Sequence, residues 1–413
     1  MHEGQNDLTS VTLDLGDAAF RADPFPVFQR LRQEDPVYRS EAVGGWVLTR
    51  YADVSAILRD PRLSADRITP FFDGLSEEQR AETKDLGDSL RKWSVFCDPP
   101  QHTRLRSLFN KAFTSRAIER LRAGIEQVVH DLLAPAAARG RIDLIAEFAY
   151  PLPAVVICEM IGLAREDIDR IKVWSAAIES FLGLARKPDD VYNTARRNVA
   201  EMADHFRGVI DDHRRRPREN ILTSLIAAAE GQERLTQDEL IATCMMLVFA
   251  AHTTTTHLIG NGMIALLRQP HSMAALRAGL TPAAIARAVE ELLRYDGPVQ
   301  VARRVVREPI EIGGRKLASG DIIFPMLNAA NRDPEQFPEP ERLDLARTEN
   351  RHIAFGYGPH FCPGAPLARM EAQIAFAAIL RTFNDIRLAG PVDWIESFGF
   401  RGLKALPLEF RAS

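Results

Sequence analysis

Apolar residues recur every three or four positions along most of this chain, a spacing that indicates α-helices with one buried face. The longest such segment runs from a capping box, Thr236 with Glu239, to Gln269, just before Pro270. At 1.5 Å per residue it would be roughly 50 Å long, enough to cross most of the molecule. The same pattern predicts further helices over 24–32, 51–59, 102–113, 118–133, 142–161, 167–184, 191–213 and from Pro282.

Strand patterns are fewer. Residues 37–49 predict a hairpin with Gly44-Gly45 at its turn. Residues 298–306 predict a strand, with 310–314 as its hairpin return. The segment 66–95 reads as irregular, and the charged residues 211–218 as a solvated loop.

Composition narrows the class of protein. The 413 residues are 46% hydrophobic and 26% charged, the balance of a soluble globular protein with a large core. A net charge of -4 argues against a nucleic-acid partner. The four cysteines form no CxxC pair, which is typical of a reducing compartment. No signal pattern is visible, and the longest apolar run, 241–251, is too short for a bilayer. We expect a cytoplasmic protein without a membrane anchor.

Cys362 stands in the Gly/Pro-rich segment 355–364, directly before a helical pattern. The free backbone N–H groups and the dipole at a helix start favour thiolate over thiol. Gly356, Gly358 and Gly364 permit tight turns and the close approach of a flat partner. The chemistry predicts a thiolate of low pKa, offered to an electrophile or to a metal. One cysteine is too few for a zinc or iron–sulfur site, whereas a haem iron needs a single axial ligand.

The spaced residues Phe355, Gly358, Cys362 and Gly364 resemble the haem-thiolate loop of the cytochrome P450 family. The resemblance extends over about residues 24–410. It implies a mainly helical fold with a smaller β-rich lobe. It also implies a haem b held by Cys362 between the long distal helix and the helix after the cysteine loop. We therefore expect a loose segment 1–20 followed by a single catalytic domain, 21–413.

Further family motifs imply the residues that bind the haem propionates. His102 and Arg106 resemble the family's His-x-x-x-Arg pair, and a spacing of four puts them on one helix face. Arg304 matches a second arginine position and His360 a position near the cysteine. Arg303 is a neighbouring alternative, but alternation along a strand would place it on the opposite face.

The middle of the long helix departs from the family pattern. In the segment 249–256, Thr254 matches the threonine beside the bound oxygen and Ala251 replaces the usual glycine. Thr253 stands where the family generally has the Asp or Glu that relays protons. Three readings stay open: water and Thr254 suffice, the substrate supplies the acid, or the reaction is a radical coupling or uses peroxide. His252 is a fourth candidate proton source.

Two more features follow from the resemblance. Glu291 and Arg294 match a Glu-x-x-Arg motif that forms a buried structural triad with a later arginine, which the alignment makes Arg342. Pro363 offers no N–H to the cysteine sulfur. A sulfur that accepts fewer hydrogen bonds keeps more negative charge, and we expect this charge to lower the reduction potential of the iron.

The implied activity is a monooxygenase that inserts one oxygen atom from dioxygen into a small, largely apolar organic substrate. A ferredoxin and its reductase would supply the electrons, and we expect a monomer. Arginine heavily outnumbers lysine, which hints at a high-GC bacterium and at secondary metabolism. Oxidative coupling or peroxide chemistry is the alternative, and a non-catalytic haem-thiolate ligand-binding protein a remote one. Phe71 and Phe72 are either lid aromatics or core residues. The candidate pocket residues are Met246, Phe249, Ala250, Val301 and Phe400.

Overall fold

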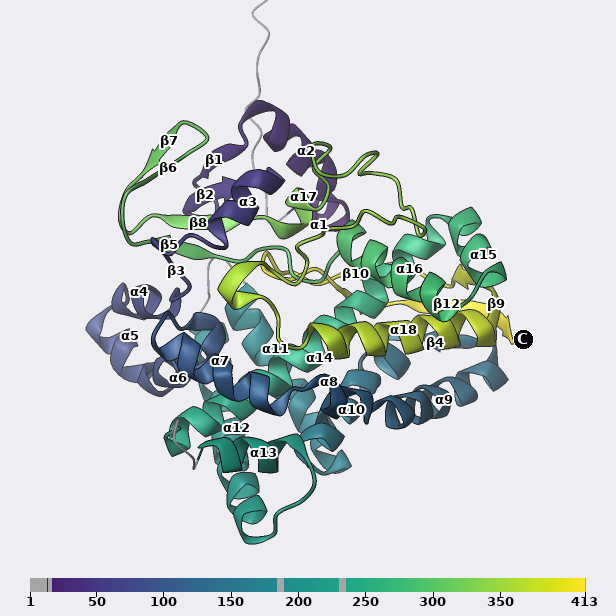
Figure 1. The fold of residues 1–413 in the computed structure, drawn as a ribbon, viewed down its shortest axis with the longest axis horizontal. Coiled ribbons are helices and arrows are strands. Elements are labelled where there is room, and N and C mark those ends of the chain that lie inside the picture. The colour runs from purple at the N-terminus through teal and green to yellow at the C-terminus, as the bar shows by residue number, and fades with distance from the viewer. Residues whose placement is uncertain (1–12, 14–16, 184–188, 230–234, 413) are drawn as a thin grey trace, which may run out of the picture.

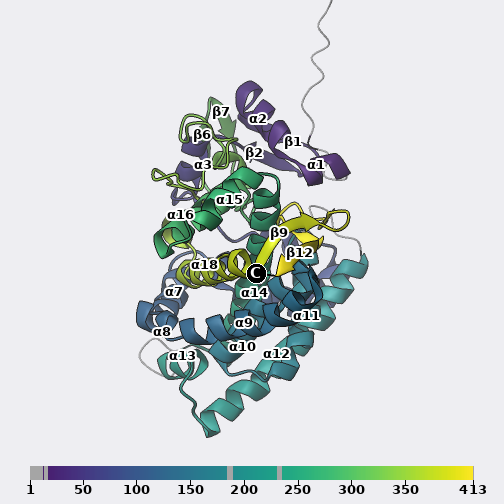
Figure 2. The same ribbon diagram turned by 90° about the vertical axis from the view of Figure 1, so that its right-hand side faces the viewer.

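Helix α14 (Gln237–Leu267) passes through the middle of the molecule, and the other helices pack around it (Figures 1 and 2). The computed structural model describes residues 13, 17–183, 189–229 and 235–412. The predicted capping box is present: the Thr236 hydroxyl accepts from the Glu239 N–H, and the Glu239 carboxylate accepts from the Thr236 N–H. Almost all of α14 is buried, which explains its nearly continuous apolar sequence.

The helices that precede α14 cover the N-terminal half of the chain. They are α1 (Ala18–Ala22), α2 (Phe25–Glu34), α3 (Tyr51–Ile57), α4 (Ile68–Asp73), α5 (Glu77–Glu82), α6 (Lys84–Leu90), η1 (Ser94–Phe96), α7 (Gln101–Ala112), α8 (Ser115–Glu119), α9 (Arg122–Arg139), η2 (Ile145–Ala149), α10 (Pro151–Ile161), η3 (Arg165–Asp167), α11 (Ile168–Gly183), α12 (Asp189–Arg215) and α13 (Ile221–Ala229).

The helices after α14 include the one that follows the cysteine loop. They are α15 (Pro270–Ala278), α16 (Pro282–Tyr295), α17 (Leu327–Ala330), η4 (Gly358–His360) and α18 (Ala365–Thr382). Helix α16 begins as predicted, because the Thr281 hydroxyl accepts from the Ala284 N–H and Pro282 takes the first position. Helix α18 packs against α9, α14 and α16.

A smaller lobe at the upper left of Figure 1 contains β1, β2, β3, β5, β6, β7 and β8, whereas β4, β9, β10 and β12 lie among the helices. The five-stranded sheet of this lobe has the order β1-β2-β8-β5-β3. In the smaller sheets, β12 pairs with both β4 and β9, β6 pairs with β7, and β10 pairs with β11. The strands are β1 (Val37–Ser40), β2 (Gly45–Leu48), β3 (Leu63–Ser64), β4 (Arg141–Asp143), β5 (Arg304–Val306), β6 (Ile310–Ile312), β7 (Arg315–Leu317), β8 (Ile322–Pro325), β9 (Phe383–Leu388), β10 (Asp393–Trp394), β11 (Leu403–Ala405) and β12 (Pro407–Ala412).

Several sequence predictions of local structure are wrong. The segment 66–95 contains the helices α4, α5 and α6. The segment 142–161 is not one helix, because its start lies in β4, whose Ile142 pairs with Leu408 of β12. Strand β5 pairs with β8 and β3, while β6 forms its own hairpin with β7. Helix α12 continues to Arg215, so the start of 211–218 is helical.

The main hydrophobic core lies among the helices, and two smaller clusters lie in the β lobe. Phe72 is buried in the main core, and the Phe71 ring packs on Phe72, Phe181 and Tyr192. These contacts favour core packing over a lid for both rings. Most of the predicted loose segment 1–20 lies outside the described residues, although Leu13 is buried.

Candidate active site

A large cavity lies between α14 and the loop that precedes α18. Its empty volume is about 2120 Å³, a figure that includes space open to solvent. Its wall is mostly apolar, and all five pocket residues predicted from the sequence line it: Met246, Phe249, Ala250, Val301 and Phe400. Cys362 also lines it, and it is the only one of the four cysteines that does so. A single, mostly apolar cavity is therefore lined at one point by a cysteine.

One face of α14 opens onto this cavity. From Glu239 to Leu266 every residue is buried except Ala250, Ala251 and Thr254. All three line the cavity, so the exposed patch is the small-residue face that a flat cofactor requires. The Thr254 hydroxyl donates to the Ala250 carbonyl at 2.9 Å, one turn back along the helix.

Thr253 and His252 lie on other faces of the helix. Both are buried and neither lines the cavity. The Thr253 hydroxyl has no hydrogen-bond partner in the part of the chain that the structure describes. The His252 ring packs edge-on against Tyr150, with 4.3 Å between ring centroids. Burial lowers the pKa of His252 to about 3, so this imidazole is neutral at physiological pH and lacks the acidic proton of an imidazolium.

The cysteine loop is shaped by glycines. Gly356 and Gly358 have φ of 74° and 75°, a left-handed conformation that other residues adopt at a cost. A Cβ at Gly358 would also stand 3.0 Å from the Leu58 carbonyl oxygen. Gly364 has an ordinary φ of -81° and serves as the N-cap of α18. Phe355 lines the cavity, and its carbonyl accepts from the Cys362 N–H at 2.9 Å.

The thiol of Cys362 does not have the predicted low pKa. Burial raises its pKa, and the N–H groups of Gly364 and Ala365 and the charge of Arg106 oppose that effect without cancelling it. Pro363 offers no N–H to the sulfur, as its sequence requires. A thiol in this position ionises when a metal coordinates it.

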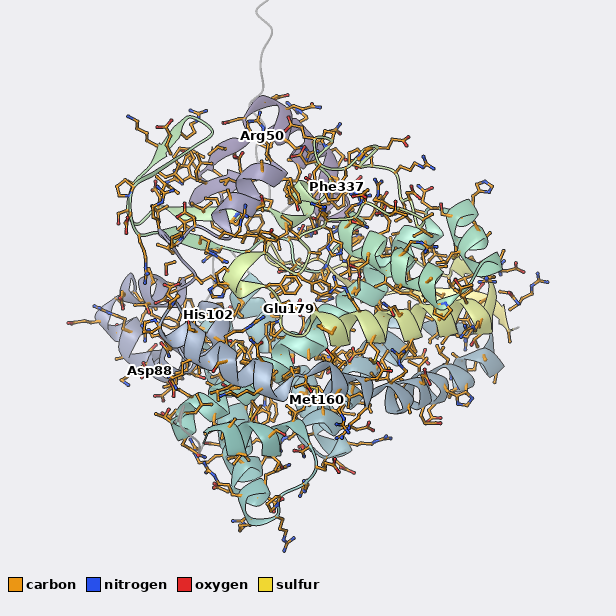
Figure 3. All side chains as sticks on the ribbon, in the orientation of Figure 1. Arg50, Asp88, His102, Met160, Glu179 and Phe337 are labelled. Atoms are coloured by element: carbon orange, nitrogen blue, oxygen red, sulfur yellow. The ribbon has the colours of Figure 1, made fainter. Side chains whose placement is uncertain are left out.

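Basic side chains gather at one rim of the cavity. His102 on α7 and His360 in the cysteine loop stack with ring centroids 4.0 Å apart, and Arg106 and Arg304 join them in the cavity wall. Figure 3 shows His102 on α7, beside the turn that leads into α18. Burial, reinforced by His102, Arg304 and Arg106, lowers the pKa of His360 to about 3. The structure thus brings all four predicted propionate residues together.

Two further arginines line the cavity. Arg303 was predicted only as an alternative to Arg304, and Arg67 was not predicted. Arg303 lines the cavity with its guanidinium 5.0 Å from the Phe324 ring centre. Arg304 pairs with Ile323 of β8, whereas Arg303 packs on the next residue, Phe324, which agrees with the predicted alternation of the two arginines. Arg67 also lines the cavity, and burial together with Arg303 and Arg304 lowers its pKa to about 9. Nothing in the local sequence around Arg67 marks it.

The buried triad contains a different arginine from the one predicted. Glu291 accepts two hydrogen bonds from Arg294, both at 2.8 Å, and both side chains are fully buried. The third member is Arg347, whose Nε lies 3.1 Å from Glu291 Oε2. The Arg342 side chain is 63% exposed and pairs with Glu339. Arg342 reaches the network only through its carbonyl, which accepts from Arg294.

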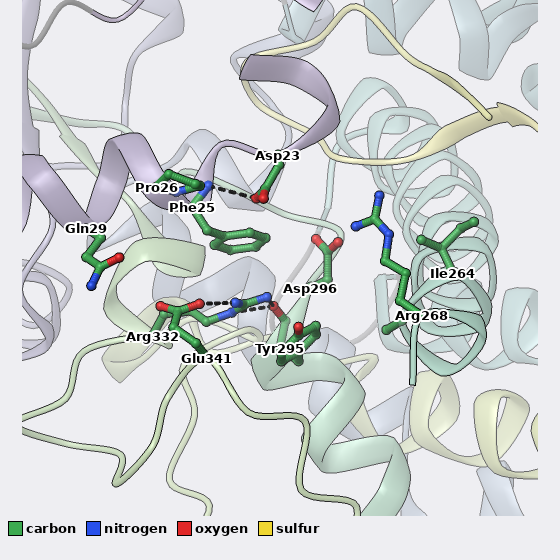
Figure 4. Close-up of a pocket in the computed structure, with 11 residues that line it drawn as sticks. Asp23, Phe25, Pro26, Gln29, Ile264, Arg268, Tyr295, Asp296, Arg332 and Glu341 are labelled. Atoms are coloured by element: carbon green, nitrogen blue, oxygen red, sulfur yellow. Dashed lines mark hydrogen bonds and ion pairs between the residues drawn. The ribbon is translucent and has the colours of Figure 1, made fainter. Parts of the chain in front are cut away.

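A second, polar cavity lies between α2, the end of α14 and α16 (Figure 4). Within it, Arg332 pairs with Glu341, donates to the Tyr295 carbonyl and stacks 3.7 Å from the centres of the Phe25 and Tyr295 rings. Asp296 pairs with Arg401 at 2.6 Å. These contacts tie α2 to the helical core and give this cavity a structural explanation.

Comparison with known proteins decides the family. The family model described as cytochrome P450 matches residues 175–387. Cytochrome P450 monooxygenase PikC of Streptomyces venezuelae is 40% identical over 97% of this chain and 94% of its own length. The chain belongs to the cytochrome P450 family.

Two further P450 relatives agree along nearly the whole chain. Polyketide biosynthesis cytochrome P450 PksS of Bacillus subtilis is 37% identical, covering 94% of this chain and 96% of its own. The crystal structure of P450BioI in complex with hexadec-9Z-enoic acid ligated acyl carrier protein superposes with a TM-score of 0.89. It is 33% identical and covers 95% of this chain and 100% of that one. The predicted helical fold with a smaller β lobe is confirmed.

As a P450, the protein is an oxidoreductase that incorporates oxygen and uses haem b with a cysteine thiolate ligand. The residues present fit that cofactor. A group of basic side chains, of which His102, Arg106, Arg304 and His360 were predicted, lines a cavity that a haem's two propionates would enter. P450s of this bacterial type take electrons from redox partners. No helix in the described ranges has the length and apolar character to span a bilayer.

Proposed function

We propose that this P450 is a monooxygenase that inserts one oxygen atom from dioxygen into a largely apolar secondary metabolite, of the polyketide class or related to it. Residues 21–413 act as one catalytic unit. The observation that carries the proposal is a single, mostly apolar cavity that both Cys362 and Thr254 line. The relatives support the substrate class, because the name of PksS specifies polyketide biosynthesis.

In this proposal each group of side chains has a separate role. Cys362 holds the iron, which supplies the chemistry of dioxygen activation when haem is bound. His102, Arg106, Arg304 and His360 hold the propionates, and Arg67 and Arg303 add charge at the same rim. The apolar wall orients the substrate and excludes water. A ferredoxin, reduced by a ferredoxin reductase, delivers the electrons.

The test is the spectrum of the reduced haem protein with carbon monoxide. We expect a strongly red-shifted Soret band, which indicates a thiolate ligand. Cys362→Ser should lose that shift. Cys244→Ser is the matched control, because Cys244 is fully buried on α14 and does not line the cavity. A parent protein that takes up no haem would refute the proposal. A screen for ligands that perturb the same band, followed by turnover with ferredoxin and its reductase, then addresses the substrate.

Thr253 supports a second candidate, oxidative coupling or peroxide-driven chemistry, because no acid stands at that position. Labelled dioxygen separates the two. A monooxygenase places one labelled atom in the product, whereas coupling gives a carbon–carbon or carbon–heteroatom bond without label. A non-catalytic binding protein would give no product, and the exposed Thr254 hydroxyl argues against it. Thr253→Glu tests the position itself: a faster rate per electron pair shows that the missing acid limits turnover.

A further inference from the structure

The main cavity contains more positive charge than a haem can balance. Four arginines among the described residues line it: Arg67, Arg106, Arg303 and Arg304. Burial is the main cause that lowers the pKa of Arg67 to about 9 and the pKa of Arg303 to about 10, so both stay protonated at pH 7. A haem's propionates carry two negative charges, while the charges of a ferric iron, the porphyrin ring and a thiolate cancel. Two of these arginines are therefore left without a counter-charge from the cofactor.

The one acidic residue among the described residues of the cavity wall does not supply that counter-charge. Glu371 lies on α18 and is only 2% exposed. Burial raises its pKa to about 8, against the opposing effect of a hydrogen bond with Thr255. At pH 7 such a carboxyl is neutral in about nine molecules of ten. Asp98, whose charge acts on Arg304 from outside the wall, is already paired with Arg307 at 3.0 Å.

The positive groups of the wall separate into two sets. The first set is the four predicted propionate residues, among which Arg106 and Arg304, in addition to burial, lower the pKa of both histidines. The second set is Arg67 and Arg303. After burial, the charge of Arg303 is the largest effect that lowers the pKa of Arg67, and it exceeds that of Arg304. The propionates thus belong with the first set, and the second set is left over.

Arg67 and Arg303 have no partner for their charge. Neither guanidinium makes a hydrogen bond or an ion pair with any residue in the described ranges. Instead they stack on aromatic rings, Arg67 at 4.7 Å from the centre of Phe96 and Arg303 at 5.0 Å from the centre of Phe324. Such a contact orients a guanidinium but leaves its N–H donors unused. A desolvated cation with unused donors is costly unless an anion binds there.

Arg303 also lies next to the apolar part of the wall. The register in which β5 pairs with β8 continues back to Val301. Strand alternation then places Arg303 on the same face as Val301 and Arg304 on the other face. Val301 is one of the apolar pocket residues of the cavity. A ligand with its charged end at Arg303 therefore has an apolar wall directly beside that end.

We propose that Arg67 and Arg303 bind a carboxylate of the substrate, so that the substrate is an apolar molecule with one acidic group. The inference rests on the monooxygenase function proposed above and narrows its substrate class to apolar carboxylic acids. The planar fork of a guanidinium matches the two oxygens of a carboxylate. A phosphate suits the site less well, because its additional oxygens need donors that the aromatic surroundings do not offer. With the carboxylate fixed, the hydrocarbon part lies along the apolar wall.

The test compares two probes of the same shape, decanoic acid and decanamide, on the haem-loaded protein at pH 7. The acid is ionised at this pH and the amide is neutral. Titration calorimetry gives both affinities without turnover or electron delivery. Because hydrogen bonds to a charged group are the stronger ones, we expect the parent to bind decanoic acid at least about 10-fold more tightly than decanamide. Equal affinities in the parent overturn the inference.

Variants then assign the preference to the two arginines. Arg67→Gln and Arg303→Gln should each weaken the binding of decanoic acid at least about 10-fold and leave that of decanamide unchanged. Arg303→Lys keeps the charge without the planar fork, so we expect an intermediate affinity. Arg39→Gln is the matched control, because Arg39 also stacks on an aromatic ring, Trp46, at 5.7 Å but is exposed and does not line the cavity. It should leave both affinities at the parental values.

Haem content and the carbon monoxide band distinguish this inference from the proposed function. Both glutamine variants should keep the haem content and the band of the parent. Loss of haem from Arg67→Gln and Arg303→Gln would assign both arginines to the propionates, and it would overturn the inference while leaving the proposed function intact. Equal weakening of decanoic acid and decanamide would also overturn it, because the two side chains would then shape the cavity without recognising charge.

Discussion

Replacing Arg347 by alanine should destabilise this protein far more than replacing Arg342, although the sequence motif points to Arg342. The Arg347 side chain is 9% exposed, and its Nε lies 3.1 Å from the fully buried Glu291 carboxylate. The Arg342 side chain is 63% exposed, and its partner Glu339 is 70% exposed. The two substitutions remove the same side chain from very different surroundings.

The magnitudes follow from those surroundings. A hydrogen bond to a charged group contributes about 1.5–3 kcal/mol. Breaking a buried ion pair completely costs about 3–5 kcal/mol. Glu291 keeps its two bonds from Arg294 in the Arg347→Ala variant, so the loss should lie between these limits, at about 2–4 kcal/mol. The exposed pair of Arg342 contributes about 0–1 kcal/mol.

The assay is guanidinium unfolding of the haem-loaded variants, with the free energy compared at matched denaturant slopes. Arg347→Lys is a useful third variant, because it keeps the charge but loses the planar fork, and we expect an intermediate loss. Haem content should fall with Arg347→Ala and stay at the parental level with Arg342→Ala. The assignment of the triad would be refuted by an Arg342→Ala loss that equals or exceeds that of Arg347→Ala.

Three further predictions concern other parts of the molecule. Pro363→Leu adds a backbone N–H beside the cysteine sulfur, so the reduction potential of the iron should rise, and an unchanged potential in a redox titration counts against this. Gly402→Ala would place a Cβ 1.9 Å from His257 Nδ1, and such overpacking should destabilise the protein by about 1–3 kcal/mol or more, measured as a lower melting temperature. Gly208→Ala is the control, because no atom lies within 4 Å of the added Cβ, and this variant should not lose stability. Because the folded-state pKa of Glu371 is raised from 4.5 to about 8, its contribution to stability is complete below pH 4.5 and is lost as the pH rises to 8. Glu371→Gln should therefore gain stability relative to the parent over that window, by at most about 5 kcal/mol, and a difference that does not depend on pH contradicts the assignment.

The sequence by itself determined the features that depend on a single element or loop. Helix periodicity places residues three or four apart on one face, so it predicted that His102 lies on the same face as Arg106, and Glu291 on the same face as Arg294. The capping box at Thr236 was found for the same reason. The spacing around Cys362 specified the loop, because left-handed turns require glycine at fixed positions.

The tertiary structure decided everything that joins distant segments. Arg347 rather than Arg342 completes the triad because the loop after α17 folds back on α16, which no periodicity encodes. Arg67 comes from a segment without a recognisable motif, and only the fold places it beside Arg303 and Arg304 in the cavity wall. Glu371 looks like an ordinary helix residue in the sequence. Only the packing of α18 on α14 buries it beside Thr255 and thereby raises its pKa, because desolvation depends on the surrounding fold and not on neighbours in the chain.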